Sequence, residues 1–160
     1  MATDFFLKID GIDGESTDDK HKGEIEIESW SWGATNVGSM GPGGGSGKAD
    51  FSDITISKQV DKSTPKLLKA AAEGQHIKSM LLTCRKARGA RGQLEYLKVT
   101  LEDVMISSYT SMASGDRPIP SETVGLNYGT IKYEYAPQKS DGSLEGFVVV
   151  GYDRRANKAS

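Results

Sequence analysis

The sequence predicts one mainly β domain, spanning residues 1–160, in which an antiparallel β-barrel carries one short flanking α-helix and a long glycine-rich loop. Three observations support this prediction. Apolar and polar residues alternate along several segments, a single segment has helical spacing with caps, and turn-forming residues separate the segments. We expect the strands to form a closed or nearly closed barrel, because closure removes most exposed strand edges.

The predicted strands follow the alternation that places successive side chains on opposite faces of a sheet. Asp10-Gly11 and Asp141-Gly142 mark turns, and Met112–Pro120 is predicted to be a loop. The segments predicted as strands are Phe5–Ile9, 24–32, 51–60, Ile77–Lys86, Leu94–Tyr109, Glu122–Ala136 and Phe147–Arg154.

One helix is predicted, and it begins just after residue 62. Ser63 or Thr64 can cap its start, Pro65 suits its first turn, and Gly74 suits its end. So short a helix is not stable alone and must pack on a sheet. The residues predicted to form its apolar face are Leu67, Leu68, Ala71 and Ala72.

The segment Glu24–Trp32 joins an acidic strand face to two tryptophans. Trp30 and Trp32 stand at even positions, as the acidic residues of this strand do, so all of them lie on one strand face unless a bulge shifts the register. One face of this strand then starts in water and ends against an apolar surface, either the chain's own core or another subunit. The acidic residues Glu24, Glu26 and Glu28 alternate with Ile25 and Ile27.

The loop Gly38–Gly47 contains six glycines and first suggests a phosphate-binding loop. A Walker A motif would need glycine where Pro42 stands and serine or threonine where Ala49 stands. The following segment also reads as a strand, whereas phosphate binding needs a helix start. Two interpretations remain: a long flexible hairpin loop, or a contact arm that orders against a neighbour.

Composition and motifs argue against several functional classes. The net charge of −2 gives no reason to expect nucleic acid or an acidic membrane as partner, and no segment is long enough to span a membrane. Cys84, the single cysteine, excludes an internal disulfide and is expected to be a small buried group. His21 and His76 lack metal-ligand spacing, and His76 is expected at the surface. We therefore predict no catalytic, metal or cofactor site.

Four cations lie close together around a predicted hairpin turn. A solvated hairpin tip is the plain interpretation, and an RNA contact is disfavoured because no aromatic residues interleave. The remaining interpretation is a salt bridge to the acidic strand of another subunit. The four cations are Arg85, Lys86, Arg88 and Arg91.

A series of short motifs runs along nearly the whole chain in a specific order and spacing. The motifs are Phe6-Leu7-Lys8-Ile9, Gly14-Glu15-Ser16, Ser29-Trp30-Ser31-Trp32-Gly33, Gly38-Ser39-Met40, the glycine run to Gly47-Lys48, Asp61-Lys62-Ser63-Thr64-Pro65, Arg85-Lys86-Ala87, Glu95-Tyr96-Leu97, Glu122-Thr123-Val124 and Tyr135-Ala136-Pro137-Gln138-Lys139. Their order and spacing, rather than any one motif, resemble the haemolysin-coregulated protein (Hcp) family of type VI secretion systems.

The resemblance implies a β-barrel with one short helix and a structural, non-enzymatic task. Hcp proteins form hexameric rings that stack head to tail into a tube, inside a contractile sheath and beneath a trimeric spike. The ring lumen can hold small effector proteins. The resemblance also implies assembly in the bacterial cytoplasm and delivery into a target cell, without membrane insertion. Residues 1–10 lack the pattern of a cleavable signal peptide, in keeping with secretion by such a machine.

Three sets of contact residues are predicted. The subunit interface is predicted to include Glu24, Glu26, Glu28, Trp30, Trp32, Arg85, Arg88 and Arg91. The ring-stacking surface is predicted to include Met40, Gly41, Gly43, Gly44 and Gly45. The lumen, unless this stretch is a solvent loop, is predicted to include Ser107, Ser108, Ser111 and Ser114.

Two other functional classes, a hydrolase and a ligand-binding barrel, are alternatives to an assembly subunit. A secreted β-barrel hydrolase would need two carboxylates in one cleft, and the sequence offers no motif for them. A monomeric ligand-binding barrel would need an apolar interior with free space, which the bulky leucine, isoleucine and tyrosine residues of the strands can instead fill.

Overall fold

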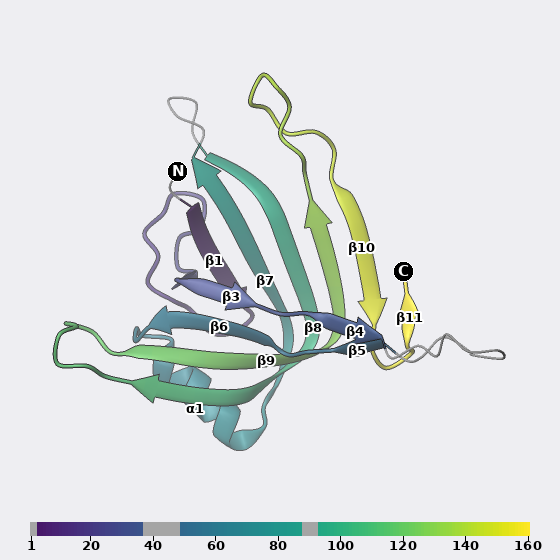
Figure 1. Cartoon of the computed structure of the whole chain (residues 1–160). Coiled ribbons are helices and arrows are strands. Elements are labelled where there is room, and N and C mark those ends of the chain that lie inside the picture. Colours follow the sequence, from purple (N-terminus) through teal and green to yellow (C-terminus); the bar gives the residue numbers. More distant parts are fainter. Residues whose placement is uncertain (1–2, 37–48, 88–92) are drawn as a thin grey trace.

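The structure is a computed structural model that describes residues 3–36, 49–87 and 93–160 (Figure 1). Strands dominate it, and a single helix is present in the described part. The elements are β1 (Thr3–Ile9), β2 (Ile25–Ile27), β3 (Ser29–Ser31), β4 (Ala34–Asn36), β5 (Ala49–Phe51), β6 (Ile54–Gln59), α1 (Thr64–Glu73), β7 (His76–Ala87), β8 (Gln93–Met112), β9 (Ser121–Tyr135), β10 (Val148–Asp153) and β11 (Lys158–Ala159).

The strands lie in two layers around one core. One layer has the order β11-β10-β9-β8-β7-β1-β2. The other, which we call the four-stranded layer, consists of β3, β6, the first part of β9 and the last part of β8. All these pairs are antiparallel, so β8 and β9 serve both layers, each with a different half of its length.

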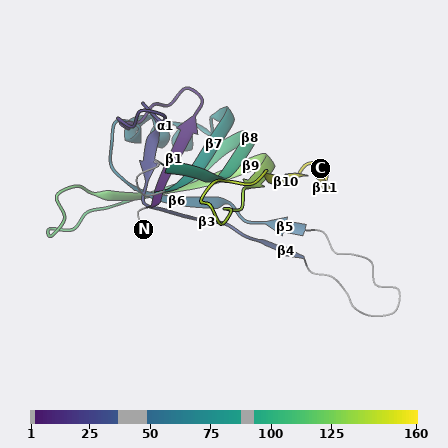
Figure 2. The ribbon, with the colours of Figure 1, turned by 90° about the horizontal axis from the view of Figure 1, so that it is seen from above.

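Strand β8 changes layer where its pairing becomes irregular. Its last partner in β7 is His76, opposite Met105, and its register with β9 shifts between Ile106 and Ser108. A bulge of this kind bends a strand and increases its twist. Beyond it, β8 and β9 continue as a hairpin on one side of the molecule, while β4 and β5 project on the opposite side (Figures 1 and 2).

The predicted mainly β fold with one helix is confirmed, but two predicted strands are interrupted. The segment 24–32 divides at Glu28 into β2, which pairs with β1, and β3, which pairs with β6. Residues 52 and 53 likewise separate β5 from β6. A main-chain hydrogen bond from the Glu28 N–H to the Ser57 carbonyl, 2.8 Å long, joins the two layers at this break. The two layers therefore meet at a corner and give the sheet a barrel-like form.

Helix α1 begins and ends at the predicted positions, but the Ser63 side chain makes no capping hydrogen bond and donates to Asp61 instead. Ser63 is the N-cap residue, and Gly74 ends the helix with φ at 62°, a left-handed conformation that glycine adopts without strain. The predicted apolar face is partly wrong, because Leu67 and Ala70 are buried whereas Leu68 is 50% exposed. No helix in the described part of the chain is long and apolar enough to cross a membrane.

A fully buried ion pair connects the helix to the sheet. The Lys58 ammonium contacts the Glu122 carboxylate and lies 3.0 Å from an Asp61 oxygen, and neither Lys58 nor Glu122 has any exposed side-chain surface. Glu122 also accepts hydrogen bonds from the Thr64 hydroxyl at 2.8 Å and the Tyr109 hydroxyl at 2.5 Å. One carboxylate thus ties β6, β8 and β9 to the first residue of α1.

Residues 12–23 form a strap across the outward side of β1 and β7. Phe6 points to this side, and its ring stacks on the His21 imidazole with centroids 4.4 Å apart. The Arg85 guanidinium lies 4.7 Å from the same ring centroid. Gly14 lies so close to the backbone of β2 that a side chain there would collide with it. Phe6 is therefore buried outside the main core, under the strap.

Charged contacts fasten the strap to the sheet. Arg85 donates two hydrogen bonds to Asp18, at 2.9 and 2.6 Å, and one to Asp4 at 3.1 Å. The His21 ring nitrogens lie 3.0 Å from Glu24 and 2.6 Å from Glu95. The hydrogen bonds from Arg85 hold the pKa of Asp18 well below its usual range. The carboxylate form of Asp18 is therefore the form that stabilises the fold.

Substituting Glu122→Gln should lower the free energy of unfolding by about 3 kcal/mol, because it leaves the buried Lys58 ammonium undercompensated. Glu134→Gln, which weakens the exposed Lys132 pair, should cost less than about 1 kcal/mol and is the matched control. Urea denaturation measures both. Equal losses in the two variants would contradict a structural role for the buried pair.

Substituting Asp18→Asn should destabilise the protein most at pH 5–7, and the loss should become steadily smaller as the pH falls below about 3.9. Because the pKa of Asp18 is depressed by folding, its contribution is complete above the unfolded value of about 3.9 and is lost as the pH falls through the folded value. Urea midpoints measured at several pH values test this. Asp19→Asn, at an exposed position next to it, is the matched control.

Candidate functional site

The outward face of the four-stranded layer carries small hydroxyl side chains. Because directly opposed residues in a sheet share a face, the register defines two rows across the four strands. The first row consists of Ser31, Thr55, Gly125 and Ser108, and the second of Ser29, Ser57, Thr123 and Thr110. We call these eight residues the hydroxyl face. They bear no charge and no bulky side chain.

The predicted lumen serines lie at different places relative to this face. Ser108 belongs to it. Ser107 lies in the bulge and donates a 2.6 Å hydrogen bond to Asp53. Ser111 is paired with Glu122, so it lies on the opposite face of the layer from Ser108. Ser114 lies in the turn after β8 and bonds to Asp116. Sequence proximity grouped these serines, but the bulge and the turn separate them.

The hydroxyl face also holds residues that the sequence analysis missed. Ser29 and Ser31 flank Trp30, and Thr55 and Ser57 flank Ile56. Each pair alternates with a residue whose side chain packs in or against the core. That alternation is visible in the sequence and could have identified the face, although which strands lie side by side depends on the fold.

Two strand edges of the four-stranded layer have no neighbour in the described part of the chain. Strand β3 pairs with β6 on one side alone. Strand β8 pairs with β7 up to Met105, so from Ser107 to Met112 it pairs with β9 alone. These edges, which we call the β3 edge and the β8 edge, lie on opposite borders of the same layer. Unpaired edges of this kind are templates for pairing with another chain.

Trp30 and Trp32 pack against the core of their own chain. Trp30 meets the Phe5 ring edge-on at 6.5 Å, and Trp32 stacks on Phe51 at 6.0 Å and contacts Tyr133. The break at Glu28 supplies the register shift that turns the tryptophans inward. Both side chains are half-buried, so they pack on the core side of the chain next to the β3 edge and are not fully exposed to solvent.

The predicted charged contact residues divide into engaged and free groups. Glu24 contacts His21, and Arg85 is 4% exposed and bound to Asp18 and Asp4, so these two are engaged within the subunit. Glu26 and Glu28 are exposed and have no ion-pair partner among the described residues. The remaining predicted contacts lie outside the described residues: Arg88, Arg91, Met40, Gly41, Gly43, Gly44 and Gly45.

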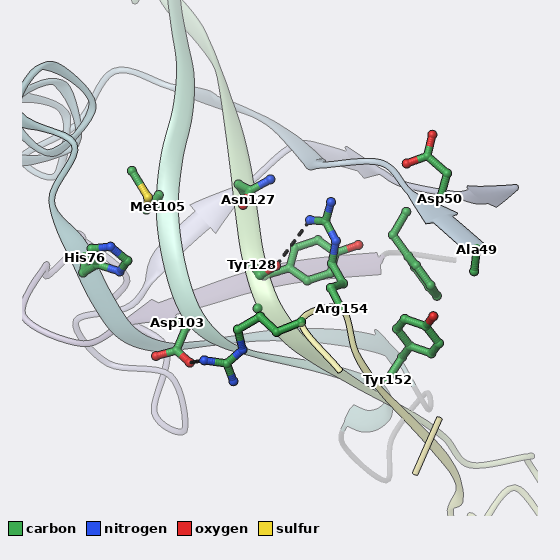
Figure 3. A pocket seen from close by; sticks show the side chains of 12 residues that line it. Ala49, Asp50, His76, Asp103, Met105, Asn127, Tyr128, Tyr152 and Arg154 are labelled. Carbon is green, nitrogen blue, oxygen red and sulfur yellow. Dashed lines mark hydrogen bonds and ion pairs between the residues drawn. The ribbon is translucent and has the colours of Figure 1, made fainter. Parts of the chain in front are cut away.

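A pocket of about 520 Å³ opens where the β4–β5 projection meets the end of β10 (Figure 3). Arg155 pairs with Asp103 at 2.6 Å across it. Arg154 donates a 3.3 Å hydrogen bond to the Tyr128 carbonyl and lies over the Tyr128 ring. His76 is exposed at the rim, as predicted, beside Met105. The lining cations are thus committed to protein groups, and the pocket shows no pairing of a nucleophile with a base.

Cys84 is buried in β7, as expected from the sequence. Burial raises the pKa of its thiol to about 11, so very little thiolate exists at neutral pH. No group of three histidine, cysteine or carboxylate side chains suited to a metal ion occurs in the described ranges. The features that distinguish this molecule are therefore surfaces: the hydroxyl face and its two open edges.

Comparisons with known proteins agree on one family. A family model described as "Type VI secretion system effector, Hcp" matches residues 6–135. Protein hcp1 of Pseudomonas aeruginosa is 43% identical to this chain over 160 residues, which cover 98% of each protein.

Solved structures of similar proteins share the whole fold. The structure of a type six secretion system protein has a TM-score of 0.91 and 34% identity, over 99% of this chain and all of the other. Hcp1 from Salmonella typhimurium has a TM-score of 0.82 and 41% identity, over the full length of both chains. Fold and sequence together show that this chain belongs to the Hcp family of type VI secretion system proteins.

Proposed function

We propose that this chain is a subunit of a hexameric ring that stacks into the inner tube of a type VI secretion system and carries small effector proteins in its lumen. Membership of the Hcp family supports the task. The observation that carries the proposal is the four-stranded layer, with an uncharged face and an open strand edge on each side.

The ring contact joins the β3 edge of one subunit to the β8 edge of the next. The two edges differ in sequence and lie on opposite borders of one layer, so the contact is heterologous. Such contacts form a closed ring when the rotation between neighbouring subunits brings the last subunit back to the first. Main-chain hydrogen bonds across this contact would pair the N–H and C=O groups of the two edges, which in the monomer are exposed to water. Six such contacts would continue the layer around the whole ring.

The hydroxyl face then lines the lumen. Its serine and threonine hydroxyls both donate and accept hydrogen bonds, so they can contact many polar surfaces of an effector. The absence of charge from the two rows keeps any one effector from being trapped by strong ion pairs. A neutral, small-residue wall therefore suits loose holding of cargo and its later release.

The other partners of the proposed tube follow from the family rather than from described contacts. The residues 40–45 remain our proposal for the ring-stacking surface, with head-to-tail stacking favoured by many equivalent contacts per ring. A trimeric spike would cap the tube, and a contractile sheath would surround it. The subunit would assemble in the bacterial cytoplasm and leave the cell with the machine, without cleavage of a signal peptide.

Substituting Ser31→Lys together with Thr110→Lys should shift the protein from rings to monomers, because like charges then lie along both edges that must meet. Light scattering after size exclusion measures the mass, and we expect about six subunits for the unmodified protein. Thr55→Lys with Thr123→Lys is the matched control, because both residues lie on the hydroxyl face but in strands paired on both sides.

Circular dichroism should show the same β content in all three proteins. A monodisperse monomer for the unmodified protein, over a wide concentration range, would contradict the proposed ring. Rings that withstand the edge substitutions as well as they withstand the control substitutions would contradict the β3–β8 contact.

A further inference from the structure

Helix α1 has a solvent-facing side with apolar and basic residues that its own chain leaves unpartnered. Leu68 is 50% exposed, and Pro65 and Ala72 are exposed beside it along one stripe of the helix. Lys69 borders this stripe, whereas Lys66 is exposed on the other flank of the solvent-facing side, and the exposed Glu73 lies one turn after Lys69. Neither lysine has an ion-pair partner in the described part of the chain. We call the three apolar residues and the two lysines the basic helix face.

A concavity of about 380 Å³ lies beside β2 and the start of the β3 edge. Its apolar lining is Ile27, Val60 and Ile119, and Ile119 is 43% exposed. The acidic residues that line it are Glu15, Glu26, Glu28 and Asp61.

Two of these four carboxylates are already engaged. Asp61 contacts Lys58, and Glu15 accepts a 2.9 Å hydrogen bond from the backbone N–H of Lys62. The side-chain carboxylates of Glu26 and Glu28 have no hydrogen-bond or ion-pair partner among the described residues, and both residues are exposed. Two free carboxylates beside an apolar lining match the chemistry of the basic helix face, which offers two free ammonium groups and an exposed leucine.

The positions of the two surfaces match as well. Helix α1 packs on β8, the strand that provides one open edge, and Glu28 immediately precedes β3, which provides the other. Leu67 of α1 is buried in the core, on the side of the four-stranded layer away from the hydroxyl face. The helix of one copy and Glu28 of the next therefore belong to the two borders that meet when the β3 edge of one copy joins the β8 edge of another.

We propose that the basic helix face of each copy docks into the acidic concavity of a neighbouring copy of this chain. Lys66 and Lys69 pair with Glu26 and Glu28, and Leu68 covers the exposed Ile119. This inference rests on the proposed ring and deepens it, because it names the side chains that select the neighbour. The contact is heterologous, as ring closure requires.

Charge reversal on either side should weaken the ring. Glu26→Lys with Glu28→Lys makes both docking surfaces basic, and Lys66→Glu with Lys69→Glu makes both acidic. Because like charges then meet at every contact, each variant alone should need about a tenfold or higher concentration to form rings, as measured by light scattering at low salt. Glu145→Lys and Lys139→Glu, at exposed positions in the connection before β10, are the matched controls and should leave the ring unchanged.

Mixing the two reversed variants should restore the ring. In a ring of alternating variants every basic surface meets an acidic one, and six positions allow strict alternation. The chain that carries all four substitutions should also form rings by itself, with the charges exchanged. A mixture of the two control variants provides the comparison for attraction between oppositely charged proteins in general.

The outcomes separate this inference from the ring itself. Rings of normal stability in both reversed variants would overturn the docking while leaving the ring intact. Loss of rings that neither mixing nor the fourfold variant restores, with circular dichroism unchanged, would also overturn the pairing. If the unmodified protein forms no ring, the proposed function fails first.

Discussion

The long antiparallel pair of β8 and β9 is the constraint on which the rest of this structure depends. The two strands are 20 and 15 residues long, and they remain paired while passing from one layer to the other. Among the residues that the structure describes, the first part of β8 has β7 as a second neighbour, and the last part pairs with β9 alone. The last part is therefore left with an open edge, and the β8–β9 hairpin continues past the core. The surface available for assembly is a consequence of this one pairing.

Two sets of charged contacts hold the remaining elements onto that pair. Glu122 of β9 brings together Lys58 of β6, Tyr109 of β8 and Thr64 at the start of α1. Arg85 of β7 holds the strap over Phe6 through Asp18. In both sets the charged side chains pair with residues of the same subunit, so these contacts form without a neighbouring subunit. Glu26, Glu28, Lys66 and Lys69, which have no ion-pair partner among the described residues, lie on the surfaces that we propose to dock.

Local patterns in the sequence predicted most elements but not their grouping into layers. The alternation in ITISKQ, the Ser63–Pro65 start of α1 and the Gly74 end are local signals, and the structure agrees with them. The sequence allows either a continuous strand or a register shift near Glu28, and the choice between them depends on β2 and β3 pairing with different strands. That break turns Trp30 inward and leaves Glu26 outside. The burial of Arg85 and the exposure of Leu68 likewise depend on which element lies opposite.

The central claim is that the β3 edge and the β8 edge pair across subunits, and hydrogen–deuterium exchange of the assembled protein tests it most directly. Unpaired edge amides exchange quickly, whereas amides bonded between strands are protected. The account predicts that the backbone amides of Ser29–Ser31 and Ser107–Met112 are protected in the ring to nearly the degree of those in β6. Fast exchange at both edges, with β6 protected, would contradict it, and new protection along the exposed Val148–Val150 segment of β10 would place the contact elsewhere.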